Sequence, residues 1–141
     1  MKSFATTTTI RAQPEAIWAL LTDAQGFTLW NSTVERVDGR IAPAEKVTVY
    51  AKASPGRAFP LKVSVFTAPE TMVWSGGMPL GLFTGQRTFT LTPTANGETH
   101  FSMREEFSGL LAPLITKSIP DLQPSFDRFA ADLKRRSEQV R

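Results

Sequence analysis

The stretch Gly85–Phe107, GQRTFTLTPTANGETHFSMREEF, predicts a long antiparallel hairpin. Apolar and polar residues alternate on both sides of Ala95-Asn96-Gly97, as in two strands that each have one buried face. A three-residue loop that ends in Gly is a common hairpin connection, because Gly tolerates the left-handed conformation needed there. With Thr94 opposite Glu98, this loop predicts three further pairs of opposite residues: Leu91 with Phe101, Phe89 with Met103, and Arg87 with Glu105.

This register brings Arg87 and Glu105 together on the apolar face of the hairpin. An ionised carboxylate there is costly unless it is paired, and the planar guanidinium of arginine can hold a carboxylate with two hydrogen bonds. Glu106 points to the opposite face, so the two adjacent carboxylates cannot act as a facing acid and base. Two interpretations stay open: the ion pair ties two strands together, or it forms the polar end of a pocket and orients a ligand's carbonyl or hydroxyl. In an extension of the second, Glu105 is a general base that acts on an acidic carbon.

The composition predicts one globular domain that spans residues 1–141, with 41% hydrophobic and 21% charged residues. The net charge of +3 at pH 7 comes partly from Lys134, Arg135, Arg136 and Arg141. Basic residues complement the dipole at the C-terminal end of a helix, which is sufficient to explain them. No basic stripe is interleaved with aromatic residues, so a nucleic-acid partner is not expected.

Residues that usually carry catalysis are scarce in this chain. It contains no cysteine and only one histidine, His100, which lies with Ser102 and Arg104 on the polar face of its strand. Thiolate chemistry, a serine-type triad and a metal site are therefore not expected, and neither a phosphate-binding loop nor a dinucleotide fingerprint suggests a cofactor. The sequence has no signal peptide pattern and no apolar run of about 18 residues, which predicts a soluble, cytoplasmic protein without stable membrane insertion.

The rest of the chain predicts further strands and an amphipathic helix. Pro14 suits the first turn of a helix that begins near Gln13 and stops near Thr22-Asp23, and Gly26–Trp30 predicts a second short helical turn. Apolar residues three or four apart from Ile119 to Leu133 predict a long C-terminal helix, reliably from Ser125 onward because Pro120 and Pro124 interrupt its start. The strands are expected at Phe4–Ile10, Val34–Val37, Lys46–Ala53, Leu61–Thr67 and Thr71–Ser75, in addition to the hairpin.

This order predicts an α+β fold in which the long helix covers one face of a curved antiparallel sheet. A cavity is expected between them, because a curved sheet and a straight helix do not mate along their whole length. The glycine-rich stretch Gly76–Gly85 is interpreted as a gate or rim of this cavity, or as an ordinary turn-rich connection. The candidate ligand-binding residues are Trp30, Trp74, Met78, Phe83, Arg87, Phe89, Met103, Glu105 and Phe126. The aromatic residues among them could equally fill a solid core.

Several motifs resemble those of the START-like SRPBCC superfamily, above all its polyketide cyclase/dehydrase-like and coenzyme-Q-binding-like members. They cover nearly the whole chain: Pro14–Asp23 (PEAIWALLTD), Trp30-Asn31, Val73–Gly76 (VWSG), Gly85–Phe89 (GQRTF), Glu105–Leu110 (EEFSGL), and Phe126–Leu133 followed by Lys134. The resemblance implies a helix-grip fold, in which a seven-stranded antiparallel sheet wraps around the C-terminal helix and two short helices follow strand 1. Members of the superfamily bind lipids, sterols, polyketides, quinones or plant hormones. Some catalyse cyclisation or dehydration, and others stimulate a chaperone ATPase.

The leading functional hypothesis is that the chain binds a hydrophobic or aromatic small molecule, such as a lipid, a polyketide or a quinone-like compound. Arg87 and Glu105 would make the polar contact with it. One alternative is an enzyme of the cyclase or dehydratase type with Glu105 as base, so whether the chain is an enzyme is left open. Another is a module that resembles the chaperone-ATPase activators, which would need an exposed patch outside the cavity. Unpaired sheet edges permit either a monomer or a homodimer.

Overall fold

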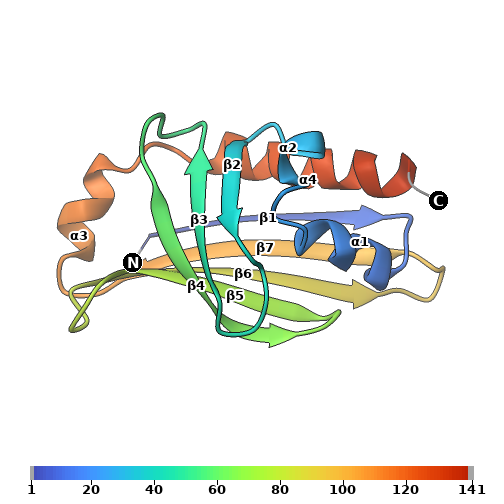
Figure 1. The fold of residues 1–141 in the computed structure, drawn as a ribbon, viewed down its shortest axis with the longest axis horizontal. Helices are drawn as coiled ribbons and strands as arrows, with labels where there is room; N and C mark the ends of the chain where they lie inside the picture. Colours follow the sequence, from blue (N-terminus) through green and yellow to red (C-terminus); the bar gives the residue numbers. More distant parts are fainter. Residues whose placement is uncertain (1, 140–141) are drawn as a thin grey trace.

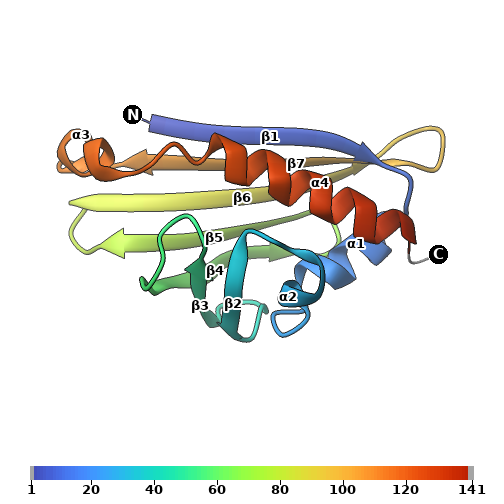
Figure 2. The same ribbon diagram turned by 90° about the horizontal axis from the view of Figure 1, so that it is seen from above.

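Seven antiparallel strands form one curved sheet in the computed structural model, which describes residues 2–139. The strand order across the sheet is β1-β7-β6-β5-β4-β3-β2, so that β1 and β2 are its edges. The long helix α4 lies across the sheet in Figure 2. The strands are β1 (Lys2–Ile10), β2 (Val34–Gly39), β3 (Lys46–Ala51), β4 (Phe59–Thr67), β5 (Thr71–Met78), β6 (Phe83–Pro93) and β7 (Thr99–Ser108).

The helices lie between β1 and β2 and after β7. Two short helices, α1 (Pro14–Leu21) and α2 (Phe27–Trp30), follow β1 as expected, and α1 lies toward the opposite end of the molecule from α3 (Ala112–Ile115; Figure 1). A short 3-10 helix, η1 (Thr116–Ser118), separates α3 from α4 (Gln123–Gln139). Helix α4 begins two residues before Ser125, because Pro124 lies in its first turn, where the missing N–H needs no partner within the helix.

The register predicted for the β6–β7 hairpin is confirmed. The backbone N–H of Thr94 donates to the carbonyl of Glu98 at 2.8 Å, which closes the loop. The three predicted pairs of opposite residues, Leu91–Phe101, Phe89–Met103 and Arg87–Glu105, are all observed. Gly97 has a φ of 75°, the left-handed conformation for which a glycine was expected.

Aromatic side chains fill the space between the sheet and α4 toward the α1 end. Phe101 of β7 stacks on Phe129 of α4 with ring centroids 6.2 Å apart, and Trp30 meets the same ring edge-on at 5.6 Å. Phe89 lies 6.1 Å from Phe129 and is fully buried. This part of the molecule is therefore a solid core.

Polar contacts fix α4 along the edge strand β1. The side chains of Gln123 and Lys134 donate to the carbonyls of Ala5 at 2.8 Å and Thr9 at 2.6 Å. In the last turn, Glu138 accepts a hydrogen bond from the backbone N–H of Arg11 at 2.9 Å. The helix is thus held near one edge of the sheet at both of its ends.

The glycine-rich stretch forms a hairpin more than a loop. Strand β5 continues to Met78 and β6 begins at Phe83, because the backbone pairs Gly76 with Gly85 and Met78 with Phe83. Only the turn 79–82 is irregular, and the backbone N–H groups of Leu110 and Leu111 donate to its carbonyls at Gly81 and Leu82. The β5–β6 turn and the segment that leads into α3 therefore form one end of the molecule.

Candidate functional site

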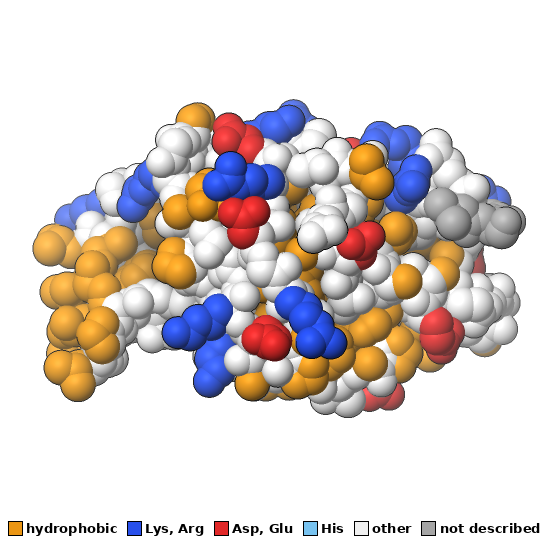
Figure 3. Space-filling view, in the orientation of Figure 1, with side chains coloured by type: hydrophobic (Ala, Val, Ile, Leu, Met, Phe, Trp, Pro, Cys, Tyr) orange, Lys and Arg blue, Asp and Glu red, His pale blue; other side chains and the backbone are white. Residues whose placement is uncertain are grey.

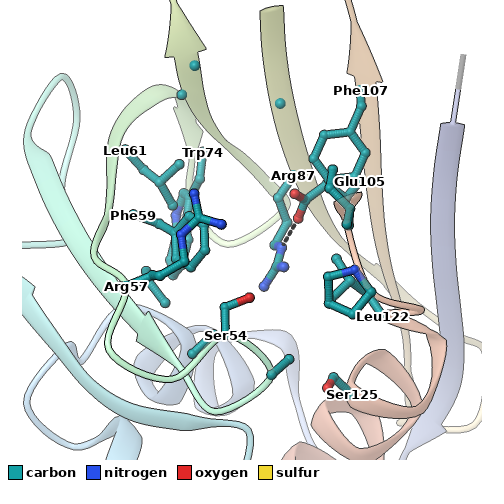
Figure 4. Close-up of a pocket in the computed structure, with 18 of the residues that line it drawn as sticks. Ser54, Arg57, Phe59, Leu61, Trp74, Arg87, Glu105, Phe107, Leu122 and Ser125 are labelled. Carbon is teal, nitrogen blue, oxygen red and sulfur yellow. Dashed lines mark hydrogen bonds and ion pairs between the residues drawn. The ribbon is translucent and has the colours of Figure 1, made fainter. Parts of the chain in front are cut away.

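A cavity of about 420 Å³ lies between the sheet and the first turns of α4. Its walls come from the ends of β5, β6 and β7 nearest α3, from β3 and β4 with the turn between them, and from the segment that joins α3 to α4 (Figure 4). Most of the side chains that line it are apolar. They include Val49, Phe59, Leu61, Trp74, Met78, Phe83, Met103, Phe107, Ile115, Ile119, Leu122 and Phe126.

Arg87 and Glu105 form an ion pair in the wall of this cavity. The Nε–H of Arg87 donates to Oε1 of Glu105 at 2.6 Å, and the two side chains are only 23% and 16% exposed. The residues are direct neighbours on β6 and β7, so the strand register holds the two groups in contact. The Arg87 guanidinium also lies 4.8 Å from the centre of the Phe126 ring, which holds it from the helix side.

The pair uses only part of the hydrogen-bonding capacity of Arg87. A guanidinium carries five N–H donors, and among residues 2–139 the structure gives a partner only to the one on Nε. In Figure 4 the guanidinium extends into the cavity beyond Glu105, so its Nη groups face the empty space. The site therefore offers charged donors at this point of a mostly apolar wall.

The cavity has a more polar side near the β3–β4 turn. Ser54 and Arg57 come from this turn and Ser125 from α4, and the Arg57 guanidinium lies 5.6 Å from the centre of the Phe59 ring. On the side of the β5–β6 hairpin the wall is apolar, where Phe83 stacks on Phe107 with centroids 5.8 Å apart. A ligand that fills the cavity would thus contact apolar surface on most sides and polar groups at a few points.

Comparison with known proteins identifies the family of the chain. Residues 1–138 match the model of the family described as polyketide cyclase/dehydrase and lipid transport. The chain belongs to this family. A search of curated proteins found no match to the sequence.

Solved structures of other proteins share the helix-grip fold of this chain. A protein from Mesorhizobium loti, MLL2253, is 21% identical, with 99% of both chains covered and a TM-score of 0.76. A START superfamily protein from Mycobacterium smegmatis is 15% identical, with 99% of both chains covered and a TM-score of 0.70. The ZhuI aromatase/cyclase from Streptomyces sp. R1128 is 11% identical, over 99% of this chain and 96% of that one, with a TM-score of 0.75. At these identities the likeness concerns the fold, which confirms the α+β helix-grip prediction.

In this family member, most of the residues predicted to bind a ligand lie around the same cavity. Those that line it are Trp74, Met78, Phe83, Arg87, Met103, Glu105 and Phe126. Trp30 and Phe89 do not line it: both rings are buried against Phe129, which itself borders the cavity. The structure therefore brings the ion pair together with Met78 and Phe83 of the β5–β6 hairpin, whereas Trp30 and Phe89 do not line the cavity.

Other lining residues were missed by the sequence analysis. Ser54, Arg57 and Phe59 belong to or follow a turn, and Ile119, Leu122 and Ser125 belong to the segment around two prolines. Neither stretch has a motif that indicates a ligand, and both reach the cavity only through the curvature of the sheet and the path of the chain before α4. The apolar spacing of Ile119 and Leu122 is the one signal in these stretches, and it predicts the C-terminal helix and not a cavity wall.

The remaining candidates for chemistry lie outside the cavity. His100 is exposed on the outer face of β7, the polar face on which the sequence places it with Ser102 and Arg104. Glu106 pairs with Arg104 at 3.1 Å on the same outer face. Within residues 2–139, no helix is both long and apolar enough to cross a membrane. The Arg87–Glu105 ion pair, by contrast, lines the cavity, as do Ser54, Arg57 and Ser125 on its more polar side.

Proposed function

We propose that the chain binds a hydrophobic or aromatic small molecule, such as a lipid, a polyketide or a quinone-like compound, between the sheet and α4. The observation that carries this proposal is a cavity of about 420 Å³ with mostly apolar walls, in which the described residues place the Arg87–Glu105 ion pair. Pockets that hold small organic ligands begin at about 300 Å³, and their walls are typically apolar with a few polar groups that set the ligand's orientation. A packing defect would not be expected to reach this size.

Arg87 is proposed to orient the ligand. Its Nε–H is held by Glu105 at 2.6 Å, while its Nη groups are available to donate to an acceptor in the cavity. Because Glu105 balances the charge of Arg87, the pair suits a neutral acceptor, such as a carbonyl or hydroxyl oxygen. The Phe126 ring restricts the guanidinium from the other side, so the donors are positioned before the ligand arrives.

Native mass spectrometry of the protein purified from its own host tests this proposal directly. We expect a species heavier than the chain by the mass of one small molecule, which organic extraction should release. Ser125→Phe, which would put a ring into the cavity, should reduce the heavier species, whereas Ala131→Phe on the exposed face of the same helix should not. Equal occupancy in both variants would show that the retained molecule binds elsewhere.

A second candidate is a cyclase or dehydratase activity with Glu105 as the base. The observation in its favour is that Glu105 lines the cavity, where a bound substrate would lie within its reach. The family description includes cyclases and dehydrases, and one similar structure is titled an aromatase/cyclase. Glu105→Gln keeps the size of the side chain but cannot accept a proton, so turnover of a polyketide-like substrate by this variant at the wild-type rate would exclude this role.

A further inference from the structure

Large apolar side chains project into solvent at the end of the molecule that carries α3. Leu80 in the β5–β6 turn is 91% exposed, and Leu110 and Leu114 beside it are 81% and 70% exposed. Figure 3 shows hydrophobic side chains gathered over this end, which lies at the left of the view. We call this surface the apolar tip and define it as Met78, Leu80, Leu110, Leu111 and Leu114. Isolated exposed leucines are ordinary, but such a contiguous group usually marks a contact surface.

The backbone of Leu80 gives a second reason to assign a function to the apolar tip. Its φ of 62° lies in the left-handed region, where a side chain with a Cβ is strained and where Gly or Asn is usually found. Strained residues persist when the surrounding structure or a function compensates them. Leu80 is almost fully exposed, so packing against the described residues, 2–139, does not provide that compensation.

The surroundings of the apolar tip favour a lipid surface as its partner. The two segments that form it, 76–86 and 109–120, contain no acidic residue and one basic residue, the exposed Lys117. In the view of Figure 3, Lys and Arg side chains border this end and no acidic side chain lies on it. Membrane-surface contacts combine projecting apolar side chains with basic residues that attract anionic lipid headgroups.

The backbone at the apolar tip is also suited to an apolar medium. The N–H groups of Leu110 and Leu111 donate to the carbonyls of Gly81 and Leu82 at 3.2 Å and 2.8 Å, so the turn and the α3 segment satisfy each other. Fewer polar backbone groups would then have to leave water without a partner. A protein partner would instead be expected to use flatter surface with hydrogen-bonding groups around an apolar centre.

The apolar tip adjoins the cavity. Met78 belongs to both the tip and the cavity wall, and Phe83 and Ile115 of the same two segments also line the cavity. A surface pressed onto a bilayer here would bring the cavity wall next to the hydrocarbon of the lipids. An apolar ligand could then pass between bilayer and cavity without crossing water.

We propose that the apolar tip docks reversibly on the surface of an anionic lipid bilayer and that ligand exchange takes place there. The exchange step rests on the proposed function, whereas the docking itself depends only on the tip. The leucine side chains would enter the boundary between headgroups and acyl chains, and Lys117 would remain at the level of the headgroups. Docking of this kind is peripheral and needs no membrane-spanning segment.

Co-sedimentation with vesicles made of equal parts phosphatidylcholine and phosphatidylglycerol tests the docking. The wild-type chain should pellet with the vesicles, and added salt or Lys117→Glu should weaken binding because headgroup attraction is screened or lost. The double variant Leu80→Asn/Leu114→Ser should bind about tenfold more weakly or worse, since two inserted apolar side chains are removed. Leu29→Ser is the matched control, because Leu29 is 75% exposed but lies on α2, and it should bind like the wild type.

Three results would overturn the docking proposal. The first is a wild-type chain that stays in the supernatant at low salt. The second is an equal loss of vesicle binding in the Leu29→Ser control and in the double variant. The third is a wild-type dimer in sedimentation analysis that the double variant abolishes, which would make the apolar tip an interface between two copies of the chain.

A separate measurement distinguishes docking from ligand binding. The fluorescence of 1-anilinonaphthalene-8-sulfonate reports whether the cavity accepts an apolar aromatic probe, and Ser125→Phe serves as the blocked reference. The double variant at the apolar tip should keep wild-type probe binding while it loses the vesicles, which supports the docking proposal and shows that the chain is folded. Vesicle binding without any Ser125-sensitive probe binding would contradict the proposed function and leave the docking in place.

Discussion

Arg87 and Glu105 contribute to stability and to the site in ways that mutation can separate. Their side chains are mostly buried, and each would lose its charge partner if the other were removed. Removal of one member of such a pair leaves an uncompensated charge against an apolar wall, whereas removal of both does not. A strand tie and a ligand-orienting group therefore give different patterns in single and double variants.

We expect Arg87→Met to lower the free energy of unfolding by about 1–3 kcal/mol, because the Glu105 carboxylate is left without its donor. The double variant Arg87→Met/Glu105→Gln should recover part of this loss, as measured by urea denaturation. Its affinity for the ligand recovered from the host should stay low, since the Nη donors are absent in both variants. A double variant that recovers stability and binds the ligand normally would reduce the pair to a strand tie.

Leu80 is expected to destabilise the isolated chain. Leu80→Asn should raise the free energy of unfolding by up to about 1 kcal/mol, because Asn tolerates the left-handed conformation that Leu80 adopts at a φ of 62°. Leu114→Asn, in the regular backbone of α3, should bring no such gain. Thermal or chemical denaturation measures this change. A loss of stability in Leu80→Asn would show that the Leu80 side chain is packed in solution and that its backbone conformation is not a net source of strain.

The sequence predicted the Arg87–Glu105 pair but not the conformation of Leu80. The register of the β6–β7 hairpin was predictable because a one-residue slip would move every apolar side chain to the wrong face, and this fixed Arg87 opposite Glu105. The left-handed backbone of Leu80 was not predictable, since only the geometry of the turn demands it and leucine rarely meets such a demand.

At the scale of elements, the last turn of α4 is held to the end of β1 by Glu138. The backbone N–H of Arg11 and, next, the Lys134 ammonium donate to its carboxylate, and both hydrogen bonds lower the pKa of Glu138 below the ordinary glutamate value. A carboxyl group whose pKa is lower in the folded than in the unfolded state stabilises the fold above the unfolded pKa. This contribution is lost as the pH falls through the folded pKa.

Glu138→Gln should therefore lower the free energy of unfolding by about 1 kcal/mol at pH 7. The difference in this free energy between variant and wild type should shrink as the pH falls below about 4. Glutamine keeps the shape of the side chain but has no charge to lose, so the variant resembles the protonated wild type. Urea denaturation across this pH range measures the gap. Glu35→Gln on the exposed side of β2 is the control and should show little effect at any pH. A gap for Glu138→Gln that does not change with pH would mean that the carboxylate charge contributes nothing.

Elements with a clear period were predicted well, and the irregular ones less so. The strands and α1 were expected nearly where they occur, because alternation and the proline at the helix start act locally. The path from Gly109 to α4 was harder to predict. Gly109 has a φ of 114°, and a Cβ there would lie 2.7 Å from the Leu82 carbonyl, so the chain depends on a close contact with a distant turn.

At the scale of the whole molecule, the existence of a cavity was predictable but its outline was not. A curved sheet under a straight helix predicts a gap somewhere along their contact, and the apolar face of the hairpin predicts one wall. The polar side depends on Ser54, Arg57 and Ser125, which lie far apart in the sequence and meet only through the curvature of the sheet. For the same reason Trp30 and Phe89, which looked like wall residues, belong to the solid core.

The core is solid toward α1 and contains the cavity toward α3. Two side-chain truncations on one strand should therefore lower the free energy of unfolding by different amounts. Phe101 and Phe107 lie on the same face of β7, and both are buried. Phe101→Ala should lower the free energy of unfolding by about 3–5 kcal/mol, because Phe101 is fully buried, does not line the cavity, and its removal leaves a new void beside the ring of Phe129. Phe107→Ala should cost about 1–2 kcal/mol less, because Phe107 already borders the cavity and its removal only enlarges an existing space.

The enlarged cavity should accept a bulkier apolar probe than the wild type. Equal losses of stability, together with unchanged probe selectivity in Phe107→Ala, would mean that the cavity is closed by packing in solution and that this half of the molecule is also solid core.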